Sequence, residues 1–142
     1  MPTISPYMIF EGNTEQAFNF YKGVFGGDFL NVQRFKDIPE GSNLPPAEKE
    51  KLMHIALPIG KANTLMAGDA LESMGNGRPG TNFQLCVESD SKEEADKIYN
   101  GLSVGGKNTM PISDTSRGSY FGMLTDKFGI EWMVNYTYPK NK

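Results

Sequence analysis

One histidine stands where it could do acid–base chemistry on the face of a strand. His54 lies in KLMHIAL, where Met53, Ile55 and Leu57 alternate with it. Alternate residues of a strand point to opposite faces, so His54 should lie opposite these apolar side chains. An unperturbed imidazole titrates near pH ~6.5 and could shuttle a proton or anchor a ligand by a hydrogen bond. A hydrogen-bonded or exposed strand histidine without a function fits the same pattern.

One carboxylate has a comparable position near the end of the chain. In GIEWMVN (129–135) the apolar residues alternate with Glu131, Met133 and Asn135. Glu131 could act as a general base if apolar neighbours raise its pKa toward neutrality. The alternative is a carboxylate at a rim, solvated or paired with a lysine. The tryptophan side of this run is expected to pack under a helix, which leaves the Glu131 side to line a pocket.

Three further residues have side chains that could react or bind a ligand. Cys86 has no base next to it in the sequence, so we interpret it as a small buried apolar residue rather than a nucleophile. Asp69 closes LMAGD and is expected to end a strand by accepting hydrogen bonds from turn amides. Arg117 in DTSRGSY could fork onto a carboxylate or phosphate, or extend into solvent.

The elements that would position these residues occur twice in the same order: a strand, a helix and three strands. Asn13 with Gln16, and Ser91 with Glu94, have the spacing of capping boxes at the two helix starts. The first set comprises a strand at 4–11, a helix ending at 26–27, and strands at 29–35, 53–59 and 63–69. The second comprises a strand at 81–89, a helix ending at 105–106, and strands at 107–113, 119–125 and 129–135.

The two halves also share local detail, which predicts an internal repeat. The helices end in FYKGVFGG and IYNGLSVGG, and Met66 and Met133 occupy matching places in the last strands. Two unrelated helices that both stop at glycine are the alternative. The repeat gives a first module at 1–70, a linker at 71–80 and a second module at 81–142, together one domain. Segment 37–51, polar and rich in proline, is predicted to be a long mobile excursion and a candidate lid.

Neither half can bury its sheet face alone, so two halves could place their strands side by side and curl into one cup, with the helices outside. Strand parity predicts a semi-polar lining for that cup. Its members are Met8, Phe10, Asn82, Gln84, Cys86, Glu131 and Met133. A few polar groups on an apolar wall are typical of a small-molecule pocket. A sheet face turned to water has the same composition.

Charge and composition exclude several classes of partner. The net charge is −3, and the 14 basic residues are scattered, which argues against nucleic-acid binding. No apolar run approaches the ~20 residues of a membrane helix, and the first residues lack the pattern of a signal peptide, so we expect neither. The single cysteine excludes an internal disulfide and fits a cytoplasmic location.

Motifs along nearly the whole chain resemble the vicinal oxygen chelate superfamily. They are SPYMIFEGNTEQAFNFYKGVFGGDF, MHIALPIG, LMAGD, MPISDT and TDKFGIEWMVN. Within the superfamily the chain is similar to the PhnB-like branch, close to the glyoxalase and bleomycin-resistance proteins. The resemblance implies an α+β fold of two βαβββ modules forming a curved mixed-sheet cup. It also implies a homodimer, because relatives usually pair. Ser116 and Arg117 replace the aromatic pair that branch members commonly carry in TFWG.

Superfamily enzymes typically hold a divalent metal in the cup with histidine and carboxylate ligands. The corresponding places fall on or near Pro6, Met66, Asn82 and Met133, none of which is a usual ligand. The resemblance therefore implies a binder of a small, partly apolar molecule, with no metal and no other cofactor expected. The alternative is a lyase, isomerase or dioxygenase that uses a divalent metal, with His54 and Glu131 as catalytic candidates. The expected ligand-binding residues are Met8, Phe10, His54, Met66, Asn82, Gln84, Arg117, Glu131 and Met133.

Overall fold

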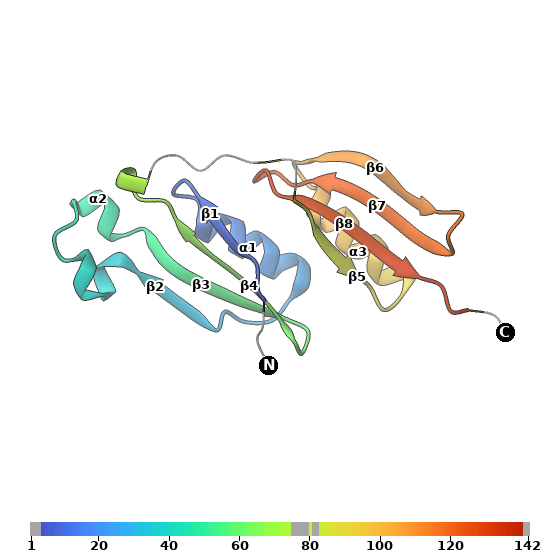
Figure 1. The fold of residues 1–142 in the computed structure, drawn as a ribbon, viewed down its shortest axis with the longest axis horizontal. Coiled ribbons are helices and arrows are strands. Elements are labelled where there is room, and N and C mark those ends of the chain that lie inside the picture. Colours follow the sequence, from blue (N-terminus) through green and yellow to red (C-terminus); the bar gives the residue numbers. More distant parts are fainter. Residues whose placement is uncertain (1–3, 75–79, 81–82, 141–142) are drawn as a thin grey trace. The chain divides into compact units, whose positions relative to one another are not determined.

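The computed structural model describes residues 4–74, 80 and 83–140 (Figure 1). Contacts divide the chain into two compact units, residues 1–78 (unit 1) and residues 79–142 (unit 2). Each unit contains a four-stranded mixed sheet and a 12-residue helix, which confirms the predicted α+β class. Residues 75–79 of the predicted linker, 71–80, lie outside the described residues. None of the described helices is long and apolar enough to cross a bilayer.

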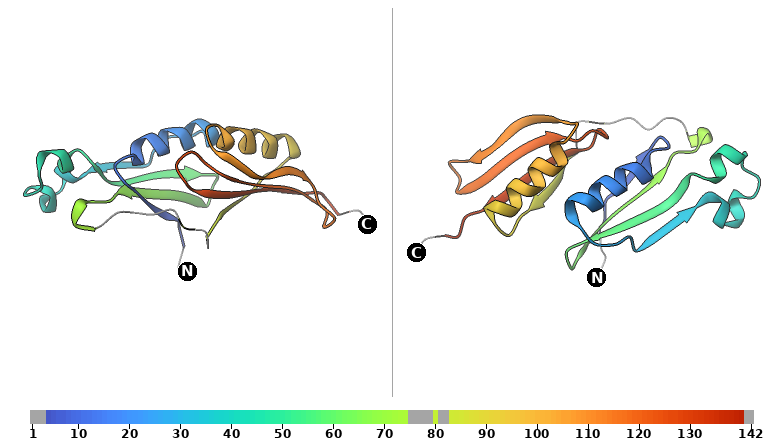
Figure 2. Two further views of the ribbon diagram at one scale, coloured as in Figure 1. Left: turned by 90° about the horizontal axis from the view of Figure 1, so that it is seen from above. Right: turned by 180° about the vertical axis from the view of Figure 1, so that it is seen from behind.

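Unit 1 contains β1 (Tyr7–Phe10), α1 (Thr14–Phe25), β2 (Asn31–Arg34), β3 (Leu52–Ile59) and β4 (Asn63–Asp69). Its sheet has the order β1-β4-β3-β2, with β1 parallel to β4 and the other neighbours antiparallel. The helix α1 lies on one face of this sheet (Figure 2). The buried core includes Phe18, Tyr21, Ile55, Leu57 and Ala67.

Unit 2 contains β5 (Leu85–Glu88), α3 (Lys92–Ser103), β6 (Lys107–Asp114), β7 (Ser119–Thr125) and β8 (Glu131–Thr137). The order β5-β8-β7-β6 repeats the topology of unit 1, with β5 parallel to β8. The repeated order of elements predicted from the sequence is therefore confirmed. Its buried core includes Tyr99, Leu102, Leu124, Trp132 and Val134. Tyr21 and Tyr99, which occur in FYKGVFGG and IYNGLSVGG, are therefore both buried.

The start of α1 differs from the prediction. Asn13 occupies the N-cap position, but its side chain accepts no capping hydrogen bond. The carboxylate of Asp69, at the end of β4, accepts hydrogen bonds from the Thr14 backbone N–H (3.1 Å) and the Thr14 hydroxyl (2.6 Å). It also accepts one from the Leu52 N–H at 2.8 Å. A buried acceptor distant in sequence thus replaces the local cap and joins α1, β3 and β4.

The start of α3 agrees with the prediction in part. The Ser91 hydroxyl accepts a hydrogen bond from the Glu94 N–H at 3.0 Å, which caps the helix as expected. The Glu94 carboxylate accepts from the N–H of Asp90 at 2.8 Å rather than from that of Ser91. The glycine stop of α1 is also confirmed, because Gly26 and Gly27 have φ angles of 79° and 85°, which favour glycine.

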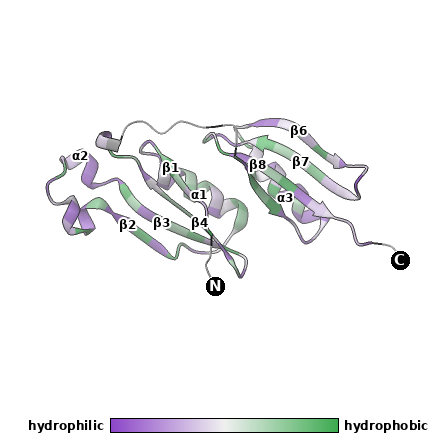
Figure 3. Cartoon of the chain, in the orientation of Figure 1, coloured by the Kyte–Doolittle hydropathy of each residue, from purple (hydrophilic) through white to green (hydrophobic). Residues whose placement is uncertain are grey.

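The segment at 37–51, predicted to be a long mobile excursion, contains short helical turns between β2 and β3. It holds the short helical turns η1 (Phe35–Asp37), η2 (Pro39–Gly41) and α2 (Pro46–Lys49), largely hydrophilic in Figure 3. The nearly buried Glu48 carboxylate accepts a hydrogen bond from the Glu72 N–H at 2.8 Å. Proline there starts helical turns instead of preventing them, since its fixed φ suits the first helical position. A role as a lid stays a prediction.

Candidate ligand-binding site

The described elements of each unit cover one face of its sheet with a helix (Figure 2). We call the opposite faces open face 1, in unit 1, and open face 2, in unit 2. In register, residues paired across neighbouring strands point to the same side. Open face 1 includes Tyr7, Asn31, Gln33, His54, Met66 and Gly68. Open face 2 includes Cys86, Glu88, Met123, Glu131, Met133 and Asn135.

His54 lies on open face 1, as strand parity predicts. Its neighbours Ile55 and Leu57 are buried under α1, at 1% and 0% exposure. The side-chain nitrogen Nδ2 of Asn31 lies 2.8 Å from His54 Nδ1. Because an amide nitrogen only donates, His54 Nδ1 accepts this hydrogen bond. The imidazole is therefore held from the neighbouring strand β2.

Tyr7 contributes the second ring on open face 1. Its ring centroid lies 5.9 Å from that of His54, and its hydroxyl donates to the Met53 carbonyl at 3.0 Å. Burial raises the pKa of this phenol. The phenol reaches Met53 across Gly68, where an added Cβ would lie 2.9 Å from the Tyr7 oxygen and 2.6 Å from the Met53 carbonyl oxygen. Glycine at this strand position leaves room for the phenol.

The assignment of β1 side chains to the cup is wrong for Met8 and Phe10. Met8 pairs with Ala67 and Phe10 pairs with Asp69, both on the α1 side of the sheet. Phe10 is 6% exposed. Tyr7 and the exposed Ile9 occupy the open face instead. The four residues YMIF are all apolar or aromatic, so the strand carries no local marker of its orientation.

Sulfur-containing side chains form a row across unit 2. Cys86 pairs with Met133, Met133 with Met123, and Met123 with Met110, which spans all four strands. Met66 has the corresponding place in unit 1, on the strand that pairs with the parallel edge strand. Methionine is flexible and polarisable and adapts to irregular apolar surfaces. Open face 2 therefore offers a soft, adaptable lining.

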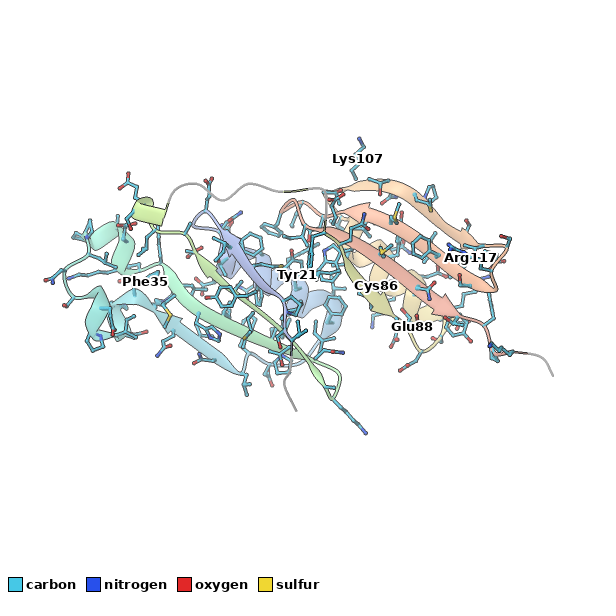
Figure 4. The ribbon with its side chains drawn as sticks, in the orientation of Figure 1. Tyr21, Phe35, Cys86, Glu88, Lys107 and Arg117 are labelled. Carbon is cyan, nitrogen blue, oxygen red and sulfur yellow. The ribbon has the colours of Figure 1, made fainter. Side chains whose placement is uncertain are left out.

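Cys86 is exposed, so its interpretation as a small buried residue is wrong. It projects from β5 beside Glu88 (Figure 4). Partial burial, and then the negative charge of Glu88, raise the pKa of the thiol. A raised pKa keeps the thiol protonated, which disfavours the nucleophile that was the alternative.

Glu131 and Gln84 lie at the same end of unit 2, in β8 and just before β5. The atoms Glu131 Oε2 and Gln84 Oε1 are buried and have no hydrogen-bond partner among the described residues. At the other end, the Glu88 carboxylate accepts from Asn135 Nδ2 (2.7 Å) and from the Thr137 N–H (3.1 Å). Open face 2 thus has satisfied acceptors at one end and unsatisfied acceptors at the other.

The remaining predicted residues do not join these clusters. Arg117 is exposed in the turn between β6 and β7, at the opposite end of β8 from Glu131 (Figure 4). Its own N–H donates to the Thr115 hydroxyl at 3.3 Å. Asn82 lies outside the described residues. Unit 2 therefore does not bring Arg117 and Glu131 together.

The residues at the superfamily's metal positions do not fit a divalent metal. Met66 and Met133 present thioethers, which prefer soft ions, and Pro6 has no side-chain donor. Within the described part of the chain, no three or more His, Cys, Asp or Glu residues gather in a way that could hold a metal ion.

Two residues of open face 1 were missed from the sequence. Tyr7 had a usable signal, because a glycine inside an apolar strand, here Gly68, often marks a close approach. Asn31 had none, since its contact with His54 depends on the pairing of β2 with β3.

Comparison with solved structures identifies the fold. A glyoxalase/bleomycin resistance protein from Albidiferax ferrireducens T118 shares the fold at 15% identity, with a TM-score of 0.65, covering 94% of this chain and 97% of that chain. PA1353 from Pseudomonas aeruginosa is 36% identical with a TM-score of 0.86, covering 98% and 100%. The fold is thus that of the glyoxalase/bleomycin-resistance proteins.

The family follows from a match over most of the chain. The chain belongs to the family described as 3-demethylubiquinone-9 3-methyltransferase, whose model matches residues 2–135. A putative 3-demethylubiquinone-9 3-methyltransferase, PhnB protein, from Bacillus cereus is 23% identical with a TM-score of 0.76, covering 96% and 100%. Protein YjdN of Escherichia coli (strain K12) is 29% identical over 137 residues, 93% of each chain. These matches confirm the resemblance to the PhnB-like branch of the vicinal oxygen chelate superfamily.

The close approach of Tyr7 to Gly68 predicts a sharp contrast between two glycine substitutions. Gly68→Ala should lower the free energy of unfolding by about 1–3 kcal/mol, because the new Cβ overlaps the Met53 carbonyl. Gly23→Ala, in α1 with nothing within 4 Å of an added Cβ, should raise it by about 0.5–1 kcal/mol. Urea unfolding of both variants measures the difference. Equal stability of the two variants would contradict the close approach of the Met53 carbonyl and the Tyr7 hydroxyl to Gly68.

Proposed function

We propose that the protein binds a small, partly apolar molecule on the open faces of its sheets, without a chelated metal ion. The observation that carries this proposal is the row Cys86–Met133–Met123–Met110 across a sheet face that its own helix does not cover. In the arrangement predicted from the sequence, the molecule would lie in the cup between the two modules.

The apolar part of the ligand is supported by the half-buried methionines. Met66, Met123 and Met133 are neither sealed in a core nor fully solvated. Covering one such side chain contributes about 1.5–3 kcal/mol at full burial. Because methionine has several rotatable bonds, the same face can adapt to ligands of different outline.

The polar part is supported by the unpaired acceptors. A buried acceptor without a donor costs about 1–3 kcal/mol. Glu131 Oε2 and Gln84 Oε1 are such atoms, and a hydroxyl or amine of a ligand would satisfy them. Glu131 and Gln84 therefore remain in the proposed site. Met133 belongs to it as well, on β8, which lies between β5 and β7.

Methyl transfer, which the family description names, is not the function that these units support best. Methyl donors of the nucleotide kind are held by glycine-rich strand-to-helix loops. Here β1 is joined to α1 by Glu11, Gly12 and Asn13, and β5 is joined to α3 by Ser89, Asp90 and Ser91. Neither connection is rich in glycine.

Substitution of Met133 tests the binding face. Met133→Lys should weaken binding of Nile red, an uncharged apolar dye, by about tenfold, because a charged side chain replaces roughly 1.4 kcal/mol of apolar contact. Fluorescence titration of the purified protein measures the dissociation constant. The emission of Trp132, the single tryptophan, checks that unit 2 stays folded.

Val104→Lys is the matched control, because Val104 is 61% exposed and follows α3 rather than lying on open face 2. It should bind the dye as the unsubstituted protein does. Equal loss in both variants, or no binding to the unsubstituted protein, would contradict the proposal.

The alternative is a superfamily enzyme that uses a divalent metal, with His54 and Glu131 as catalytic candidates. Elemental analysis separates the two functions. We expect far less than one divalent ion per chain, even after incubation with Mn, Ni, Zn and Fe, since thioethers replace the usual ligands. One tightly held ion per chain would support the enzyme.

We further propose that the protein is a homodimer, because the uncovered faces and open edge strands, including the exposed Ile9 and Val32, offer surface for a second copy. Light scattering at micromolar concentration should give twice the mass of 15.7 kDa. A monomer would contradict it. A cytoplasmic location stays a prediction, which cell fractionation tests.

A further inference from the structure

The side chains of open face 1 form a donor-rich group that differs in chemistry from open face 2. No described strand residue on this face is acidic. The polar ones are Tyr7, Asn31, Gln33, His54 and Thr64. A ligand group with lone pairs therefore contacts no carboxylate from these strand residues. Open face 2, in contrast, carries the carboxylates of Glu88 and Glu131.

We propose that Asn31 fixes the tautomer of His54 so that the imidazole presents its Nε2–H to a carbonyl or carboxylate oxygen of the ligand. This inference rests on the proposed function, and it names both a positioning residue and the chemical class that the site takes. Neither Asn31 nor His54 belongs to the row of sulfur-containing side chains or to the positions of the superfamily's metal ligands.

The contact between the two side chains carries the first step. Asn31 Nδ2 lies 2.8 Å from His54 Nδ1. An amide nitrogen can donate a hydrogen bond but cannot accept one. Nδ1 must therefore be unprotonated, which places the ring proton of neutral imidazole on Nε2. Nε2 has no hydrogen-bond partner among the described residues, so its proton is available to a ligand.

The neighbours of His54 carry the second step. Tyr7 packs against the imidazole, with ring centroids 5.9 Å apart at an interplanar angle of 38°. The hydroxyl of Tyr7 is engaged with the Met53 carbonyl at 3.0 Å, and burial raises its pKa, so it stays a neutral packing group. Gln33 pairs with His54 across β2 and β3 and adds an amide donor beside the ring. The oxygen-binding atom is therefore Nε2, next to the apolar side chains of Ala56 and Met66.

The chain contains one histidine, so a single imidazole pattern appears in long-range ¹H–¹⁵N NMR spectra. Recorded at pH 9, where free imidazole is neutral, the spectrum of the unsubstituted protein should show the Nε2–H tautomer. In Asn31→Asp the new carboxylate can only accept, so the proton should move to Nδ1 and leave Nε2 as an acceptor. A Nδ1–H tautomer in the unsubstituted protein would overturn the proposal.

Binding is measured with acetophenone, an uncharged ring with an acceptor oxygen and no donor. It should shift the Nε2 signal of the unsubstituted protein saturably, and Asn31→Asp should weaken its binding by about threefold to tenfold, the range of one lost neutral hydrogen bond. Benzylammonium, a donor of similar size, should not bind at Nε2. Asn63→Asp makes the same chemical change at the exposed start of β4 and should leave both the tautomer and the affinity unchanged.

The outcomes separate this inference from the proposed function. Acetophenone binding that is unaffected by Asn31→Asp, or equally weakened by Asn63→Asp, overturns the role of Asn31. If Nile red binds in a Met133-dependent manner but acetophenone does not bind, only the acceptor site fails. If neither probe binds, the proposed function fails as well.

Discussion

Each sheet has four strands and one long helix, and a single helix layer can bury only one face of such a sheet. In unit 1 the covered face is closed at its end by Asp69, whose buried carboxylate joins α1, β3 and β4 through three hydrogen bonds. In unit 2 the buried Asp126 accepts from Phe128, Ile130 and the indole of Trp132, which fixes the entry of β8. These hydrogen bonds stabilise the face of each sheet that the helix covers, and they do not stabilise the opposite face. The faces opposite the helices retain half-buried apolar side chains, among them Met66, Met123 and Met133. The proposed function follows from this incomplete burial.

The repeat gives both units one topology, and their open faces have diverged in chemistry. The row Tyr7–Met66–Ala56–Asn31 crosses unit 1, and the row Cys86–Met133–Met123–Met110 crosses unit 2. Open face 1 offers hydrogen-bond donors from amides and an imidazole, whereas open face 2 combines sulfur with carboxylates. Open face 1 is therefore suited to a ligand group that accepts hydrogen bonds, at His54, and open face 2 to a ligand group that donates them, at Glu131.

Sequence patterns predicted the elements well where polar and apolar residues alternate. In β3, the His54 side chain lies on the open face, and Ile55 and Leu57 lie on the buried face. In β8, Trp132 and Val134 lie on the face opposite Glu131 and Met133. Parity alone therefore assigns the faces of both strands. In β1 all four residues are apolar or aromatic, and only pairing with β4 decides that Phe10 is buried. The cap of α1 was missed for a related reason, because Asp69 lies 55 residues from Thr14 and no local rule connects them. At 37–51, proline initiates short helical turns, which the composition of the segment did not indicate. For β1 and for the cap of α1, what escaped prediction was a contact between segments distant in sequence.

The thioethers at Met66 and Met133 change what the fold can do. A chelating site places its polarity at the centre of the sheet face, since histidine and carboxylate ligands must converge on one ion. Here the central positions are apolar, and the polar groups stand beside them, at His54 in unit 1 and at Glu131 and Gln84 in unit 2. A ligand on such a face is held by apolar contact in its middle and by hydrogen bonds at its edges. In the proposed function, the determinants of specificity are therefore the polar residues that flank the methionines.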